Sequence, residues 1–390
     1  MAELSQTPQG NRIHIAFFGL RNAGKSTLVN AFCGQDVAIV SPTPGTTTDP
    51  VAKAMEILPL GPCLVTDTAG LDDEGELGLM RVEKTLRVLD STDIAVWVNG
   101  DSADAGVNPA RPESAPYRQG DALSIASQPA LNAESFKTRF LEECRRRQVA
   151  VIEFNRGESA AELKAKIAAV KTAADPALLE GLVKRGDRVT LVCPIDESAP
   201  KGRLILPQVQ VLRECLDRHA IVRVVQPDEF TDDGALTIVD SQTFGRIRAA
   251  NLTSFSILFA RQKGDLDEFK RGLAAARALR DGDRVLIAEA CTHHRQCNDI
   301  GATKIPKALA KLSGGAKIEL AFASGNDFAV DGKFALVVHC GGCMLTRRTM
   351  LARIARCRAA AVPVVNYGLL LQAAANTNLS ANCNLCHCRT

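Results

Sequence analysis

The chain is short of aromatic residues: phenylalanine, tyrosine and tryptophan make up 4% of it, with one Trp and two Tyr. It also lacks a charge excess, since 47 basic residues face 44 acidic ones and the formal net charge is +3. Proteins that bind RNA need a basic surface with aromatic side chains that stack on bases. The composition therefore argues against a nucleic-acid-binding protein, and against one that bulk charge draws to an acidic membrane.

Long apolar runs are missing as well. No stretch approaches the roughly 20 apolar residues that a membrane-spanning helix needs. Residues 1–12 are polar and lack the apolar segment of a secretory signal peptide. With 390 residues, 46% of them apolar, the chain has enough material for two or three domains with their own cores. We expect a soluble, cytoplasmic protein without a membrane or nucleic-acid partner.

Cysteine, by contrast, is abundant, with 13 residues. In a cytoplasmic protein, closely spaced thiols bind metal or serve redox chemistry more often than they form disulfides. Two runs are of this kind, CTH at 291–293 and HCGGC at 339–343, and each follows a stretch typical of a buried strand. Other cysteines lie in apolar or helical patterns and are expected to be small core residues: Cys33, Cys63, Cys144, Cys193, Cys215 and Cys357.

A phosphate-binding loop, GLRNAGKS, occupies residues 19–26, between an apolar run at 13–18 and a helical pattern at 27–32. This strand–loop–helix context is the one that GxxxxGK[ST] requires. Backbone N–H groups of such a loop surround the β-phosphate at the positive end of the helix. Lys25 is expected to contact the β- and γ-phosphates, and the Ser26 hydroxyl to ligate Mg²⁺. The residues expected at the nucleotide are Gly19, Asn22, Ala23, Gly24, Lys25, Ser26 and Thr27.

Two further segments follow in the order of a P-loop GTPase. PGTTTD at 44–49 resembles switch I, and DTAG at 67–70 resembles switch II. Asp67 is expected to hold the Mg²⁺ shell through water, and the Gly70 amide to sense the γ-phosphate. This half of the chain resembles the TrmE–Era group of GTPases, and the resemblance implies that Thr47 is the switch I Mg²⁺ ligand.

The same resemblance bears on the rate of hydrolysis. Leu71 stands where Ras-like enzymes carry a glutamine that orients the attacking water, so hydrolysis needs help from elsewhere. Asn22 stands where the TrmE group has an asparagine that helps to bind K⁺; alternatively, it is a loop residue that satisfies its own backbone. The resemblance implies a slow, potassium-stimulated GTPase.

The guanine-reading motif NKxD appears in altered form, as Asn155-Arg156-Gly157-Glu158 behind an apolar run. The stem of Arg156 can stack on a purine as a lysine does. Glu158 can accept hydrogen bonds from guanine, although its extra methylene displaces the carboxylate by about a bond length. We expect Asn155, Arg156 and Glu158 to read guanine. Residues 100–130 lack periodicity and are expected to be a flexible insertion.

The middle of the chain predicts a smaller α/β domain. A charged helical pattern at 160–182 leads to a domain border near 184–187. Beyond it, apolar strand patterns and one amphipathic helical pattern alternate: 188–193, 209–218, 221–225 and 236–239. This order indicates a small parallel sheet covered by helices, and we interpret its role as packing or self-association.

Three apolar runs in the last third, at 284–288, 334–338 and 362–365, are typical of buried strands. Ligands of doubly wound sheets bind beyond the carboxyl ends of parallel strands. If the first two runs are parallel neighbours, Cys291, Cys340 and Cys343 converge on one crevice.

Three thiolates with an open fourth position suit a [4Fe–4S] cluster. Zinc would prefer a closed shell completed by His293 or His339, and on chemistry alone both metals stay open, with iron–sulfur favoured. Each histidine is otherwise a core imidazole or one that supports a ligand. The fourth cluster position stays open between these histidines, Glu289 and solvent.

The C-terminal third contains a CxH motif and a HCxxC motif, separated by residues 294–338, and it follows a TrmE-like half. This combination resembles the HydF family of [FeFe]-hydrogenase maturation GTPases. Family-like runs also occur at 199–208, 253–261 and 366–368, so the similarity extends from 13 to about 371. The resemblance implies an α/β protein in which a P-loop GTPase domain precedes two smaller domains with mainly parallel sheets. The implied borders are 1–180 for the GTPase domain, 181–262 for a dimerisation domain and 263–390 for an iron–sulfur domain.

The resemblance further implies a GTP-hydrolysing scaffold that binds a [4Fe–4S] cluster and carries the diiron precursor of the H-cluster to apo-[FeFe]-hydrogenase. Its partners would be that hydrogenase, the radical-SAM maturases and a second copy, with tetramers as a further state. The alternative is a TrmE/Era-like RNA- or ribosome-directed GTPase with a structural zinc domain. The tail, 373–390, departs from the family pattern: Cys383, Cys386, His387 and Cys388 suggest a second metal site, a redox-sensitive thiol cluster or an ordinary solvated end.

Overall fold

The computed structural model describes residues 7–34, 51–72, 75–100, 133–170, 175–195, 204–290, 300–325 and 328–375. The chain divides into two compact units, one made mainly of residues 11–173 and the other of residues 174–390 together with 8–10. The expected insertion at 100–130 and the cysteine-rich tail lie almost wholly outside the described residues, as do Thr47, Cys291 and His293.

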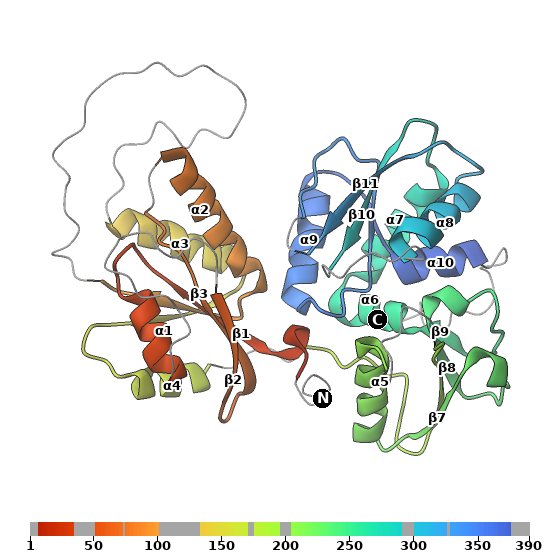
Figure 1. Ribbon diagram of the computed structural model, residues 1–390, viewed down its shortest axis with the longest axis horizontal. Helices are drawn as coiled ribbons and strands as arrows, with labels where there is room; N and C mark the ends of the chain where they lie inside the picture. Colours follow the sequence, from red (N-terminus) through yellow and green to blue (C-terminus); the bar gives the residue numbers. More distant parts are fainter. Residues whose placement is uncertain are drawn as a thin grey trace. The chain divides into compact units, whose positions relative to one another are not determined.

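The first unit is a five-stranded sheet between two layers of helices (Figure 1). Its strands are β1 (Ile13–Phe18), β2 (Val51–Ile57), β3 (Gly61–Asp67), β4 (Ile94–Val98) and β5 (Ala150–Phe154), in the order β2-β3-β1-β4-β5. Only the β2–β3 pairing is antiparallel. The helices are α1 (Lys25–Cys33), α2 (Gly75–Val88), α3 (Ala133–Arg146) and α4 (Ala160–Ala168), with short 3₁₀ turns η1 (Gln9–Asn11) and η2 (Leu89–Ser91).

Alternation along β1 explains the two layers. Ile15 and Phe17 point into one core, which α1 and α4 complete, while Ala16 and Phe18 point into another, shared with α3. Successive side chains of a strand face opposite sides, so a strand that is apolar throughout must be covered on both faces. The parallel strands therefore end together at one edge, where Phe17 pairs with Asp67 and Val98 with Phe154.

The helix expected at 160–182 is wrong in its second half. Helix α4 begins with a capping box, in which Ser159 and Glu162 bond to each other's backbone N–H groups, and it ends at Ala168. Beyond it, residues 178–182 form turns. Pro176 explains the break, because proline has no N–H to donate and disfavours helical geometry in the residue before it.

The second unit contains two parallel sheets. One has the order β7-β6-β8-β9, with β6 (Arg188–Val192), β7 (Ile221–Val225), β8 (Leu236–Val239) and β9 (Leu252–Ser254). Helices α5 (Leu206–Asp217) and α6 (Phe255–Lys263) pack against it, and its loops contain the 3₁₀ turns η3 (Pro227–Glu229) and η4 (Ser241–Thr243).

The other sheet has the order β11-β10-β12-β13. Its strands are β10 (Arg284–Glu289), β11 (Glu319–Ser324), β12 (Leu336–His339) and β13 (Val364–Asn366), all parallel. The helices are α7 (Leu266–Arg277), α8 (Ile305–Leu312), α9 (Arg347–Ala359) and α10 (Tyr367–Ala375), and a π-helical turn, η5 (Ile300–Lys304), leads into α8. Figure 1 shows α9 on one side of this sheet and α7 and α8 on the other.

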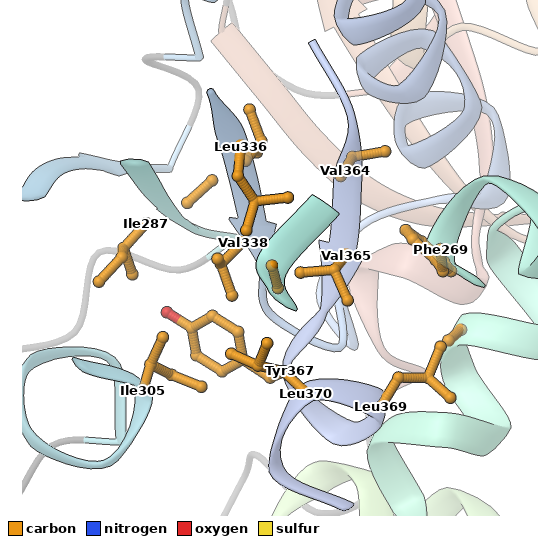
Figure 2. Close-up of a cluster of buried hydrophobic side chains, with 14 of the residues drawn as sticks. Phe269, Ile287, Ile305, Leu336, Val338, Val364, Val365, Tyr367, Leu369 and Leu370 are labelled. Carbon is orange, nitrogen blue, oxygen red and sulfur yellow. The ribbon is translucent and has the colours of Figure 1, made fainter. Parts of the chain in front are cut away.

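One hydrophobic core joins the two sheets of the second unit. It contains Val192 and Val239 from the first of them together with β10, β12, β13 and the helices around these strands. Figure 2 shows its centre, where Val338, Val365 and Tyr367 meet. The expected fold class, a P-loop GTPase domain followed by smaller parts with parallel sheets, is confirmed. Within the described residues, no helix is both long and apolar enough to cross a membrane.

Candidate functional site

The phosphate-binding loop joins the end of β1 to the start of α1. Gly24 and Asn22 adopt left-handed backbone angles, with φ of +82° and +60°. A Cβ on Gly19 would lie 2.7 Å from the carbonyl oxygen of Val98, so this position has no room for a side chain. The loop thus curls as tightly at the N-terminus of α1 as the sequence motif predicts, and its amides lie at the positive end of that helix.

Ser26 and Asp67 meet below this loop. The Ser26 hydroxyl donates to Oδ2 of Asp67 at 2.6 Å, while the buried Oδ1 has no hydrogen-bond partner within the described part of the chain. Burial raises the pKa of Asp67, against the influence of Ser26 and Lys25. A buried carboxylate oxygen without a partner, beside a hydroxyl, is a hard oxygen donor set that fits Mg²⁺. The Lys25 ammonium meanwhile donates to the carbonyl of Leu20 at 2.7 Å.

Switch II lies directly against the phosphate-binding loop. A Cβ on Gly70 would be 2.9 Å from the Arg21 nitrogen, so only glycine fits here. The Arg21 N–H donates to Asp72 Oδ1 at 2.5 Å, a contact that the sequence did not reveal. Leu71 donates its N–H to Gly19 and buries its side chain in the core beside α3, so it cannot orient an attacking water.

The altered base-reading motif lies at the end of β5, on the same edge of the sheet. Asn99, at the end of β4, donates to Oδ1 of Asn155 at 2.8 Å, and Asn155 donates to Oε1 of Glu158 at 3.1 Å. Lys166 on α4 forms an ion pair of 2.7 Å with Glu158. Hydrogen bonds from Lys166 and Asn155 lower the pKa of the Glu158 carboxyl. The carboxylate is therefore charged and held in one place, while the Arg156 side chain is exposed.

The second candidate site lies at the carboxyl edge of the β10–β12–β13 sheet. Strands β10 and β12 are parallel neighbours as expected, with Ala288 opposite His339. The N–H of Ala290 donates to the sulfur of Cys340 at 3.1 Å. Ala290 is the last described residue before Cys291. The described segment therefore stops one residue short of Cys291, at a point where its backbone contacts the Cys340 sulfur.

Backbone amides surround the two described thiols of this edge. Burial, together with the neighbouring Cys343, raises the pKa of the Cys340 thiol to about 11. Hydrogen bonds from the N–H groups of Gly342 and Ala290 act in the opposite direction. Burial also raises the pKa of Cys343, against Lys263 and the N–H of Met344. Amides aimed at sulfur stabilise thiolates and suit the soft ligand set of an iron–sulfur cluster. Within the described ranges, which omit 291–299, no three histidine, cysteine or acidic side chains gather around a common point.

His339 is a buried imidazole with both ring nitrogens engaged. Nδ1 lies 2.8 Å from the carbonyl oxygen of Cys340, and Nε2 lies 2.9 Å from Nη1 of Arg353. A guanidinium can only donate, so Nε2 accepts and Nδ1 carries the proton. Burial lowers the pKa of His339 to about 3, and the charge of Arg353 adds to this effect. The imidazole is thus neutral, and ligation through Nε2 would break its bond with Arg353.

Asn366, opposite His339 in the sheet, contributes a buried donor to this edge. Its Oδ1 accepts from the N–H of Gly368 at 2.7 Å and lies 3.1 Å from the Ser256 hydroxyl. The side chain is fully buried, yet its Nδ2 has no partner within the described residues. Glu289, at the end of β10, is also buried and accepts from the Tyr367 hydroxyl at 3.4 Å. The sequence offered Glu289 as a possible ligand, whereas Asn366 stood out only as part of the family-like run 366–368 and was given no role at this site.

Three family models match the chain, each over its own stretch. Residues 14–122 match the model described as 50S ribosome-binding GTPase. Residues 178–264 match the Hydrogen maturase F dimerization domain, and residues 267–380 match the Hydrogen maturase F tetramerization domain. The latter two stretches together cover more than half of the chain.

Several individual proteins that are similar to part of this chain are tRNA modification GTPases. The tRNA modification GTPase MnmE of Thermus thermophilus (strain ATCC BAA-163) is 40% identical over 85 residues, which are 22% of this chain and 19% of that protein. MnmE of Methylobacterium sp. (strain 4-46) is 38% identical over 104 residues, 25% of this chain and 24% of that protein. The chain thus matches a quarter or less of the length of these relatives. Among solved structures, Aquifex aeolicus Era bound to GDP.AlF4⁻ aligns with a TM-score of 0.24 and 18% identity, over 59% of this chain and 94% of that one.

Proposed function

This chain belongs to the hydrogen maturase F family, and we propose that it is a GTP-hydrolysing scaffold for assembly of the [FeFe]-hydrogenase H-cluster. In this role it binds a [4Fe–4S] cluster through Cys291, Cys340 and Cys343. It receives the diiron precursor of the H-cluster and carries it to the apo-hydrogenase. The family membership supports this role, and the chemistry of the sheet edge supports the residues assigned to it.

The observation that carries the proposal is the hydrogen bond from the Ala290 amide to the Cys340 sulfur. Cys291 directly follows Ala290, and consecutive Cα atoms are about 3.8 Å apart. Its thiol is therefore within reach of the other two thiols. The parallel pairing of β10 with β12 brings about this approach, although the strands are far apart in the sequence.

The ligand set and its surroundings fit an iron–sulfur cluster better than zinc. Three cysteines leave one iron of a [4Fe–4S] cluster with a coordination position open to another group. His339 would close a zinc shell, but its Nε2 is bonded to Arg353. We therefore assign His339 to support of the loop and leave the fourth position to His293, Glu289 or an exchangeable ligand such as the cargo.

The nucleotide half acts as a switch. Lys25 binds the phosphates, Ser26 and Thr47 ligate Mg²⁺, Asp67 holds the metal's water shell, and Gly70 senses the γ-phosphate. Leu71 stands in the place of the water-orienting glutamine, and its buried apolar side chain cannot orient a water molecule. We infer slow hydrolysis, stimulated by a K⁺ ion at Asn22, whose left-handed backbone lies in the phosphate-binding loop.

Association with other proteins follows from the same assignment. The dimerisation and tetramerisation models that match the second unit support a homo-oligomer. The proposed partners are the apo-[FeFe]-hydrogenase, which receives the cargo, and the radical-SAM maturases, which produce it. We propose that this exchange takes place in the cytoplasm.

The test is iron and sulfide analysis with electron paramagnetic resonance after anaerobic reconstitution. We expect wild-type protein to bind about four irons per chain. The variants Cys291→Ala, Cys340→Ala and Cys343→Ala should lose the cluster signal while GTP turnover persists. Cys33→Ala, in the GTPase unit, serves as the matched control and should keep both.

The reciprocal variant is Lys25→Ala, which should abolish nucleotide binding and leave the iron content unchanged. Zinc in place of iron and sulfide in the wild-type protein would refute the carrier role. It would favour the alternative, a TrmE/Era-like GTPase with a structural zinc domain.

A further inference from the structure

The last residue of α6, Lys263, is a buried cation beneath the loop that joins the two described thiols. Its side chain is 1% exposed. The ammonium donates to the carbonyl oxygens of Leu345 at 2.6 Å, Cys343 at 3.2 Å and Gly342 at 3.4 Å. An ammonium has three N–H donors, so these three carbonyls account for all of them. Lys263 therefore holds the backbone of the thiol loop at three points.

We infer that Lys263 is a positioning residue for the cluster: it fixes the 342–345 backbone around Cys343 and places a buried positive charge behind the thiolates. This inference rests on the proposed function and extends it to a residue that no motif reveals. Lys263 touches the loop carbonyls and acts on the cluster through them and through its charge.

The energetics of burial support this role. A buried charge costs several kcal/mol unless compensating groups surround it, so a structure rarely keeps one where an apolar side chain would serve. Burial lowers the pKa of Lys263 to about 8, and negative charge on Cys343, Asp175 and Cys340 would act in the opposite direction, in that order. Two of these three are the proposed ligands. The Phe259 ring, whose centroid is 5.1 Å from Nζ, supplies a further favourable contact.

The packing around Lys263 also keeps water away from its charge. A Cβ on Gly10 would lie 2.5 Å from the Leu345 oxygen and 3.1 Å from the Lys263 nitrogen, so this segment of the second unit closes tightly over the lysine. Charges that are screened from water act on each other more strongly and over longer distances. The cation therefore favours a more negative cluster. It should stabilise the reduced state, which carries one more electron, relative to the oxidised state.

The experiment compares Lys263→Arg, Lys263→Gln and Lys263→Met in the full-length protein. In the two neutral variants we expect the equilibrium constant for one-electron reduction of the cluster to fall about tenfold, a shift of about 59 mV. Lys263→Arg should stay close to the wild-type potential. In the apo-protein, amide hydrogen exchange at 342–346 should be faster in Lys263→Met, and GTP turnover should not change in any variant.

Lys317→Gln is the matched control, because this exposed lysine precedes β11 at the opposite edge of the same sheet. If Lys263→Met does not fold, the comparison of Gln with Arg decides, since both side chains donate hydrogen bonds and only arginine keeps the charge. Wild-type potential and unchanged loop exchange in the neutral variants would overturn the role of Lys263. Absence of iron–sulfur in the wild-type protein would instead overturn the proposed function.

Discussion

At the scale of single residues, Glu158 is the least familiar member of the nucleotide site. Its longer side chain is held in position, because Lys166 and Asn155 both donate hydrogen bonds to its carboxylate. The ion pair with Lys166 fixes where the carboxylate points and keeps it ionised. We expect this support to compensate for the extra methylene, so that Glu158 can accept hydrogen bonds from guanine.

We predict that Glu158→Ala lowers the preference for GDP over ADP by at least about tenfold, since a hydrogen bond to a charged group contributes about 1.5–3 kcal/mol. Glu158→Asp, which restores the more common side chain, should keep the preference. Dissociation constants measured with fluorescent GDP and ADP analogues check this. An unchanged ratio in the alanine variant would mean that another residue reads the base.

Residues within a contiguous motif could be predicted from the sequence, and residues that act across the fold could not. Lys25 and Ser26 are singled out by the spacing of the phosphate-binding loop; in the structure they bond to Leu20 and Asp67, and their roles at the nucleotide stay predictions. Lys263 and Arg353 escaped notice because each acts on a segment remote in sequence. A lone lysine or arginine has no pattern, and its role emerges only when folding buries it.

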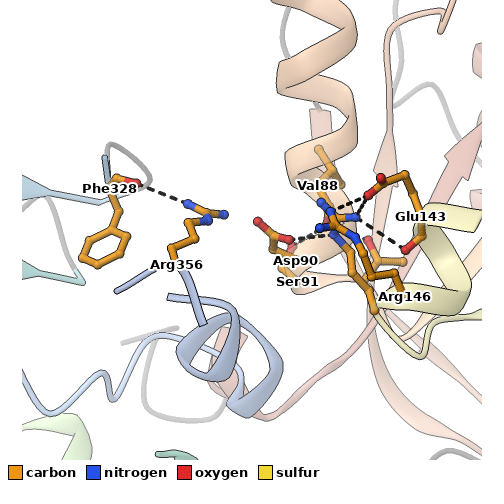
Figure 3. A network of polar contacts seen from close by, with 9 residues as sticks. Val88, Asp90, Ser91, Glu143, Arg146, Phe328 and Arg356 are labelled. Carbon is orange, nitrogen blue, oxygen red and sulfur yellow. Dashed lines mark hydrogen bonds and ion pairs between the residues drawn. The ribbon is translucent and has the colours of Figure 1, made fainter. Parts of the chain in front are cut away.

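At the scale of secondary-structure elements, an arginine after α3 joins two parts of the GTPase unit. Arg147 forms ion pairs with Asp90 of η2, at 2.9 Å, and with Glu143 of α3, and Arg146 also pairs with Glu143 (Figure 3). Burial alone would raise the pKa of Glu143, but hydrogen bonds from Arg147 and Arg146 outweigh it and lower the pKa. The network therefore anchors the end of α3 to the segment that follows α2.

We predict that Arg147→Gln destabilises the GTPase unit by about 1–2 kcal/mol at neutral pH, less than a fully buried pair because the partners are partly exposed. Since the pKa of Glu143 is lowered in the folded state, its contribution is present above the unfolded pKa and is lost as the pH falls through the folded one. The difference from wild type should therefore shrink in acid. Urea unfolding at a series of pH values measures it, and a constant difference would contradict the assignment.

Strands with continuous apolar runs could be found in the sequence, whereas edge strands could not. Buried strands such as β1 and β10 were expected within a residue of their bounds. β2 and β11 were missed: most side chains of β2 alternate between partly buried and exposed, and those of β11 are exposed or only partly buried. At a sheet edge, hydrogen bonding to a neighbour makes the strand, and composition gives little sign of it.

At the scale of the whole molecule, the two compact units have separate cores. We predict two transitions in calorimetry of the full chain. GDP with Mg²⁺ at about 100 times its dissociation constant should stabilise the first unit by about 2.7 kcal/mol and leave the other transition in place. A single transition that shifts as a whole would show that the units unfold together.

The smaller parallel sheets could be predicted from the order of elements. The hydrophobic core that the two sheets of the second unit share could not. The expected border at 262/263 falls between Gln262 and Lys263, in the last turn of α6. Helix α6 packs with the first sheet of the second unit, and Lys263 at its end holds a loop of the next sheet. Long-range packing of this kind depends on which faces meet, and periodicity along one segment does not contain that information.

The meeting of Ala290 with the Cys340 sulfur exists only after β12 has docked beside β10, and the chain first runs through α8 and β11. Such a long crossover forms slowly, because chain entropy is lost before contacts repay it. We therefore expect the proposed set of cluster ligands to be completed late, so that iron enters a protein that is already folded. On the proposed function, we expect protein made without iron to accumulate in a folded, cluster-free form that binds iron and sulfide when they are supplied.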